Sequence, residues 1–73
     1  MQLTQNALIQ IDRLFTYHPP KFGQPERYAA IRDAAKAFAL VLAANCPDGP
    51  DTNYAIVKVR ESVMMANAAI ALE

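Results

Sequence analysis

The sequence predicts an all-α protein in which a short N-terminal helix precedes an antiparallel helical hairpin. Three segments carry apolar residues at every third or fourth position, which is the spacing of one helix face. Stretches with proline and glycine, at 19–23 and 47–50, separate these segments. No segment alternates apolar and polar residues in the way that a half-buried strand does. The 73 residues are enough for one domain, which we expect to span 1–73.

The first helix is expected from about Thr4 to Phe15. Thr4 is a suitable N-cap, because a threonine hydroxyl can accept a hydrogen bond from a first-turn amide. The apolar stripe of this segment consists of Ala7, Leu8, Ile11, Leu14 and Phe15. Pro19-Pro20 ends the helix, since proline lacks an amide donor and disfavours helix at the preceding residue. The connector 16–24 should therefore be extended, with a bend at Gly23.

The second helix is expected from Pro25, a favourable first-turn residue, to about Asn45. Its apolar residues alternate by three and four, as in a heptad seam. They are Tyr28, Ile31, Ala35, Phe38 and Leu42. The stretch 46–50, Cys-Pro-Asp-Gly-Pro, predicts both the end of this helix and a turn.

The third helix is expected to begin after Asp51 or Thr52, either of which can serve as N-cap, and to end near Leu72. Its seam residues are Ile56, Val59, Val63, Ala66 and Ile70, and a second apolar stripe consists of Val57, Met64, Ala68 and Ala71. A helix that is apolar on two faces has to be covered on two faces. Hydrophobic residues make up 53% of the chain, which is more than a small helical monomer can bury. We therefore expect a homo-oligomer.

The composition excludes several classes of function. His18 and Cys46 are single representatives of their type, so one chain can build neither a disulfide framework nor a four-ligand metal site. The net charge of zero argues against coating DNA or RNA polymers. No apolar run approaches the ~18 residues of a membrane span, and residues 1–6 show no signal-peptide pattern. We expect a cytoplasmic protein that contacts no membrane and has no cofactor.

No catalytic constellation is evident either. Cys46 lies at a predicted helix C-terminus, where the helix dipole disfavours a thiolate. His18 has no orienting partner that the sequence reveals. We therefore predict no catalytic residue, no metal ligand and no enzymatic activity.

The segment 16–36 concentrates the polar chemistry of the chain. It holds two tyrosines, the only histidine and four cations, namely Tyr17, His18, Lys21, Arg27, Tyr28, Arg32 and Lys36. Aromatic faces stack on nucleobases, and the two prolines keep the ordering cost of binding low. Arginine binds phosphate oxygens bidentately, whereas lysine acts as a point charge. The segment predicts a site for a small anionic ligand that carries bases.

Structural interpretations of the same residues stay open. Tyr17 and the prolines could simply end the first helix, and Arg32 could pair with a nearby acid. Lys58 and Arg60 could form a solubilising rim, or a second anion site where copies of the chain meet. The main alternative to ligand binding is a protein–protein module, in which the exposed stripe of the third helix docks a partner helix.

Two strings of residues resemble a known family. They are Phe-Thr-Tyr-His-Pro-Pro at 15–20 and Val-Met-Met-Ala-Asn-Ala-Ala-Ile-Ala at 63–71. Between them stand Gln24, Arg27, Tyr28, Ile31, Arg32, Ala35, Lys36 and Cys46-Pro47. With these residues, the chain from about Phe15 to Ala71 resembles the helical-hairpin domain of phage anti-defence sponges. That domain is shared by the anti-CBASS cyclic-nucleotide sponges and the Thoeris anti-defence sponges.

The resemblance implies a homohexamer that sequesters cyclic oligonucleotide second messengers in the infected bacterial host and so blocks CBASS effector activation. Cyclic dinucleotides such as cyclic GMP–AMP would bind between protomers, and cyclic trinucleotides at a separate junction. Tyr17 would stack on a base, and Arg32 and Lys36 would meet phosphates with Arg27 or Lys21 nearby. Arg60 would serve the trinucleotide junction.

Two departures from the family pattern refine this expectation. The extra region of Thoeris-type members is not seen in this short chain, which favours the anti-CBASS side. Met65 stands where the family often has an aromatic residue, and this substitution is expected to loosen the oligomer.

Overall fold

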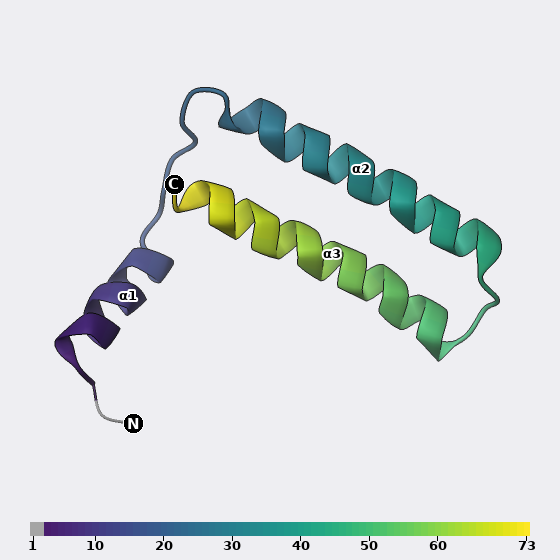
Figure 1. The fold of residues 1–73 in the computed structure, drawn as a ribbon, viewed down its shortest axis with the longest axis horizontal. Helices are drawn as coiled ribbons and strands as arrows, with labels where there is room; N and C mark the ends of the chain where they lie inside the picture. Colours follow the sequence, from purple (N-terminus) through teal and green to yellow (C-terminus); the bar gives the residue numbers. More distant parts are fainter. Residues whose placement is uncertain (1–2) are drawn as a thin grey trace.

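A computed structural model describes residues 3–73 as three helices (Figure 1). Helix α1 spans Gln5–Phe15, α2 spans Gln24–Asn45 and α3 spans Pro50–Ala71. Helices α2 and α3 lie side by side and antiparallel, whereas α1 lies beyond the open end of this hairpin, near the end of α3 (Figure 1). The part of the chain that the structure describes contains no strand, so the all-α prediction is confirmed. Residues 1 and 2, which belong to the predicted domain and to the stretch without a signal-peptide pattern, lie outside the described residues.

Local capping explains where the first two helices begin. Thr4 is the N-cap of α1 as predicted, and its Oγ1 accepts a hydrogen bond from the Ala7 amide at 3.1 Å. Helix α2 begins at Gln24, one residue before Pro25. Its N-cap is Gly23, whose φ of 81° lies in the left-handed region that glycine adopts without a Cβ penalty. This glycine is the predicted bend in the connector.

The predicted start of the third helix was wrong. Helix α3 begins at Pro50 with Gly49 as N-cap, before both Asp51 and Thr52. Proline suits the first helical position, because its φ is already helical and the amide it lacks would have no partner there. The Thr52 hydroxyl donates to the Pro47 carbonyl at 2.5 Å instead of capping the helix. Asp51 lies in the first turn, where a negative charge favours the helix dipole.

The contact between α2 and α3 supplies the packing of the hairpin. The α3 seam faces α2: Ile70 is buried, and Ile56, Val59, Val63 and Ala66 are half-buried. The second stripe is largely uncovered, since Val57 and Met64 are exposed. The two predicted stripes are thus confirmed as one covered and one uncovered face. With extents of 49 × 36 × 12 Å the chain is one helix layer thick, and among residues 3–73 Ile70 is the only buried hydrophobic residue.

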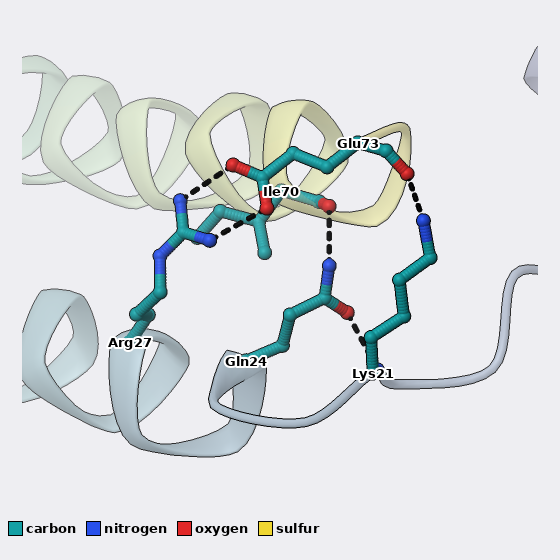
Figure 2. A network of polar contacts seen from close by, with 5 residues as sticks. All are labelled: Lys21, Gln24, Arg27, Ile70 and Glu73. Carbon is teal, nitrogen blue, oxygen red and sulfur yellow. Dashed lines mark hydrogen bonds and ion pairs between the residues drawn. The ribbon is translucent and has the colours of Figure 1, made fainter.

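Gln24 closes the open end of the hairpin and is the only buried polar residue in the described chain. Its Oε1 accepts from the Lys21 amide at 2.9 Å, and its Nε2 donates to the Ile70 carbonyl at 2.9 Å (Figure 2). One side chain therefore joins the connector, the start of α2 and the end of α3. Buried polar groups are stable only when they are paired in this way.

The variant Gln24→Ala should lower the free energy of unfolding by about 1–3 kcal/mol, because the Lys21 amide loses its acceptor and a buried site is emptied. Urea denaturation followed by circular dichroism measures this change. The matched control is Gln5→Ala at the exposed first residue of α1, which should stay within about 0.5 kcal/mol of the wild type. Equal midpoints for the two variants would show that the Gln24 contacts do not stabilise the hairpin.

Candidate functional site

The predicted site residues fall into two groups. Tyr17, His18, Lys21 and Arg27 lie around the open end of the hairpin, whereas Arg32, Lys36 and Arg60 line a groove along it. Tyr28 is half-buried on the α2 seam. The structure therefore brings Arg60 of α3 to the two cations of α2, and it places Tyr17 in a different pocket.

The cationic groove, lined by Arg32, Lys36 and Arg60 over an apolar floor, has a volume of about 250 Å³. The floor consists of Ala35, Ala39, Ile56, Val59 and Val63. Arg32 and Lys36 are one turn apart on α2, and Arg60 faces them from α3. None of the three forms an ion pair with any residue from 3 to 73, so the predicted alternative of an Arg32–acid pair is absent there. Positive charges without an internal partner are available for an anionic ligand.

Lys58 behaves differently from Arg60. Its Nζ donates to Glu61 Oε2 at 3.1 Å, one turn further along α3, and both side chains are exposed. This contact is a surface pair on a helix, which contributes little to stability. Lys58 therefore fits the interpretation as a solubilising rim. Arg60 differs from it because Arg60 lines the cationic groove.

A second pocket lies where the connector passes the end of α3. It has a volume of about 280 Å³ and is lined by Leu14, Thr16, Tyr17, His18, Ala68, Ala71 and Leu72. His18 Nε2 is 2.8 Å from the Arg13 carbonyl, and because a carbonyl can only accept, this nitrogen carries the proton. The His18 ring thus has an orienting partner that the sequence did not reveal.

Exposed aromatic residues surround this open end. The Tyr17 side chain is 81% exposed, and Phe22 is 106% exposed. Sequence reasoning missed Phe22, although an aromatic residue between a proline pair and the bend glycine belongs to no helix stripe. Two aromatic faces on a connector fixed by prolines are suited to stacking on flat rings.

Two of the residues predicted to lie near the phosphates of a ligand have partners inside the chain (Figure 2). The Arg27 guanidinium donates to both carboxylate oxygens of Glu73, at 2.6 and 2.7 Å. Lys21 Nζ donates to the backbone oxygen of Glu73. Hydrogen bonding by Arg27 lowers the pKa of Glu73, and the same hydrogen bonds and charge raise the pKa of Arg27. Arg27 and Lys21 therefore bind Glu73, just beyond α3. Of the predicted cations, Arg32, Lys36 and Arg60 have no ion-pair partner within residues 3–73.

Comparison with known protein families shows to which family the chain belongs. A family model described as the Acb2/Tad1 hairpin domain matches residues 7–71, which include nearly all of α1 and the whole of α2 and α3. The chain belongs to the Acb2/Tad1 hairpin family. This is the family of anti-CBASS and anti-Thoeris sponges, so the resemblance noted in the sequence is confirmed. No curated protein and no solved structure gives a significant match.

Within the part of this sponge-family hairpin that the structure describes, neither a metal-ligating cluster nor a membrane-spanning helix is found. From residue 3 to 73 there is no group of three histidine, cysteine or acidic side chains that could hold a metal ion. Over the same range no helix combines the length and the apolar character that crossing a bilayer requires.

The Arg27–Glu73 pair makes the stability of the sponge-family hairpin depend on pH. Because the pKa of Glu73 is lowered in the folded state, the pair stabilises the fold above the ordinary glutamate pKa of about 4.3, and this contribution is lost as pH falls through the lower folded value. Wild type should therefore melt at a higher temperature than Glu73→Gln at pH 7, and the difference should vanish near pH 2.

A double-mutant cycle provides the control for this prediction. Arg27→Gln should show the same pH-dependent loss, and Arg27→Gln combined with Glu73→Gln should add little to either variant. A gap between wild type and Glu73→Gln that is the same at pH 7 and pH 2 would show that the pair does not form in solution.

Proposed function

We propose that the chain is a non-enzymatic phage anti-defence sponge. It binds cyclic oligonucleotide second messengers, namely cyclic dinucleotides such as cyclic GMP–AMP and, at a second site, cyclic trinucleotides. It holds them intact in the cytoplasm of the infected bacterial host, so that CBASS effectors stay inactive. The cationic groove, in a chain of the sponge family, is the observation that carries this proposal.

The chemistry of the groove fits this ligand class. Each internucleotide phosphate carries one negative charge, and an arginine fork can donate two parallel hydrogen bonds to its oxygens. Arg32, Lys36 and Arg60 supply the charge, and the apolar floor between them offers a surface for a ribose or a base. Tyr17 and Phe22, both exposed on the connector, offer aromatic faces for stacking. Because a sponge acts stoichiometrically, this combination has to bind tightly.

The size of the groove supports a site that is shared between copies. Pockets for small ligands usually enclose ~300–1,000 Å³, whereas the cationic groove of one chain encloses about 250 Å³. The aromatic and cationic elements also line different pockets of the same chain. A second copy could place its Tyr17 opposite Arg32 and Lys36 and complete the enclosure. We propose a homohexamer as the assembled form.

One observation favours a second candidate function. The uncovered stripe of α3 exposes Val57 and Met64, and the neighbouring Met65 is 71% exposed. Methionine-rich exposed surfaces adapt readily to partner helices. A protein–protein interaction module would use this stripe and would leave the cationic groove without a ligand.

Native mass spectrometry distinguishes the two functions. The protein is measured alone, with cyclic GMP–AMP and with cyclic tri-adenylate. We expect a hexamer that gains each ligand in a fixed ratio and releases it chemically intact on denaturation. An assembly or monomer that takes up neither ligand would favour the protein–protein module, and degraded ligand would exclude a sponge.

Replacement of Tyr17 by alanine should weaken cyclic dinucleotide binding by about 5- to 150-fold and leave the native mass unchanged, because stacking of a base on an aromatic side chain contributes about 1–3 kcal/mol. Isothermal titration calorimetry gives the dissociation constant. The matched control is Tyr54→Ala in the first turns of α3, where the tyrosine is 67% exposed but lines neither the cationic groove nor the pocket at the open end. Equal affinities of wild type and Tyr17→Ala would remove Tyr17 from the site.

A further inference from the structure

Helix α1 has an apolar face that no other helix covers. Within residues 3–73, α2 and α3 are the only helices packed against one another. The α1 stripe is accordingly open to solvent: Ile11 at its centre is 44% exposed, and Leu8 and Leu14 are exposed as well. Isolated helices shorter than about 12–15 residues are marginal in water, and α1 has 11. A helix of this length and polarity needs a covering surface.

The hairpin offers such a surface on the face opposite the cationic groove. This apolar groove has a volume of about 630 Å³ and is lined by Ile31, Ala34, Ala35, Phe38, Leu42, Ala55, Lys58, Val59, Ser62 and Val63. Ala35, Val59 and Val63 line both grooves, so the two share the α2–α3 seam as their floor. At about 100° per residue, Ile31 and Phe38 lie on one side of Ala35, whereas Arg32 and Lys36 lie on the other.

The stripe and the apolar groove match in length and chemistry. The stripe from Ala7 to Phe15 covers eight residue steps, or about 12 Å at 1.5 Å per residue. The groove follows α2 from Ile31 to Leu42, eleven steps or about 16 Å. Its only charged lining residue is the cation Lys58, and the only acid of α1 is Asp12, which flanks the stripe. Lys58 lies at the rim of this groove and already pairs with Glu61, so the match rests on the apolar surfaces. An apolar stripe in an apolar groove is the helix-in-groove arrangement.

The chain cannot place α1 in its own apolar groove while the contacts at the open end persist. Arg13 of α1 donates to the Leu72 carbonyl at 2.9 Å, and His18 donates to the Arg13 carbonyl. These bonds tie the last turn of α1 to the end of α3, and α1 lies outside the hairpin (Figure 1). The middle of the groove, at Phe38 and Val59, is therefore left for a helix from elsewhere.

We propose that α1 of one copy docks its apolar stripe into the apolar groove of a second copy. The inference rests on the proposed assembly and names the surface through which copies join. Docking on this face leaves the cationic groove of the same hairpin open for ligand. It also fixes the position of Tyr17, which follows α1 by two residues, relative to the second copy.

The test compares Ile11→Asp with Ile9→Asp. Both isoleucines are partly exposed, at 44% and 55%, and they lie about 160° apart around α1. Ile11 is at the centre of the stripe, whereas Ile9 is on the opposite face. By native mass spectrometry, Ile11→Asp should fall to a lower mass at concentrations at which Ile9→Asp keeps the mass of the wild type. Phe38→Asp should reproduce the loss from the side of the groove.

Three outcomes would overturn the docking. They are a monomeric wild type, an Ile11→Asp protein of wild-type mass, and equal loss of mass in the Ile9 and Ile11 variants. The proposed function is judged separately, by ligand uptake. An assembly that depends on Ile11 but takes up no cyclic nucleotide would support the docking and reject the sponge. Ligand uptake by an Ile11→Asp protein of wild-type mass would support the sponge and reject the docking.

Cysteine cross-linking shows whether α1 acts between chains. In a Cys46→Ser background, Ile11→Cys and Phe38→Cys are made as separate proteins, mixed and oxidised. A disulfide requires Cα atoms within about 7 Å, so the mixture should yield a covalent dimer with one chain of each variant. Docking between copies would be overturned if the mixture failed to cross-link. It would also be overturned if one chain carrying both Ile11→Cys and Phe38→Cys formed a disulfide within itself.

Discussion

The seam between α2 and α3 is the contact on which the rest of the structure depends. Because the chain forms a single helix layer 12 Å thick, each helix of the hairpin is covered on one side only. Of the described hydrophobic residues only Ile70 is buried, and large side chains such as Phe38 and Met64 remain in solvent. A chain of this size gains little from its own core. The uncovered apolar faces are the surfaces that the proposed assembly would use, and for this reason the two grooves on either side of the seam matter for the proposed function.

At the open end of the hairpin some of the cations form contacts within the chain, and the others lie in the cationic groove. Gln24, buried and bonded to the connector and to α3, fixes how the two helices meet. Arg27 and Lys21 add contacts to Glu73 at the surface, where ion pairs are individually weak. Because Arg27 and Lys21 are bound to Glu73, the other cations predicted to bind a ligand are Arg32, Lys36 and Arg60, which lie together in the cationic groove. Fold stability and the proposed ligand binding would thus use different members of one cationic segment.

The division of the hairpin into two unlike faces fits a sponge. The proposed function requires no catalytic group, only a surface that binds an anion tightly and a way of enclosing it. One face carries Arg32, Lys36 and Arg60 around an apolar floor, and the other is almost entirely apolar. Assembly through the apolar face would leave the cationic face for ligand. The connector, with its prolines and its exposed Tyr17, joins α1, which would serve assembly, to the hairpin, which would bind the ligand.

Features that depend on near neighbours could be predicted from the sequence. Thr4 as cap, the helix ends at Phe15 and Asn45, the bend at Gly23 and the covered seam of α3 all follow from residues within one or two turns of each other. The start of α3 at Pro50 was missed because three adjacent residues compete to begin that helix, and the Thr52 hydroxyl bonds to Pro47 instead. Tertiary structure alone decided that Arg27 pairs with Glu73, 46 positions away, and that Arg60 joins Arg32 and Lys36. Such partners are set by how far α3 slides along α2, and that register depends on the turn, the seam packing and the Gln24 contacts together, which no local pattern encodes.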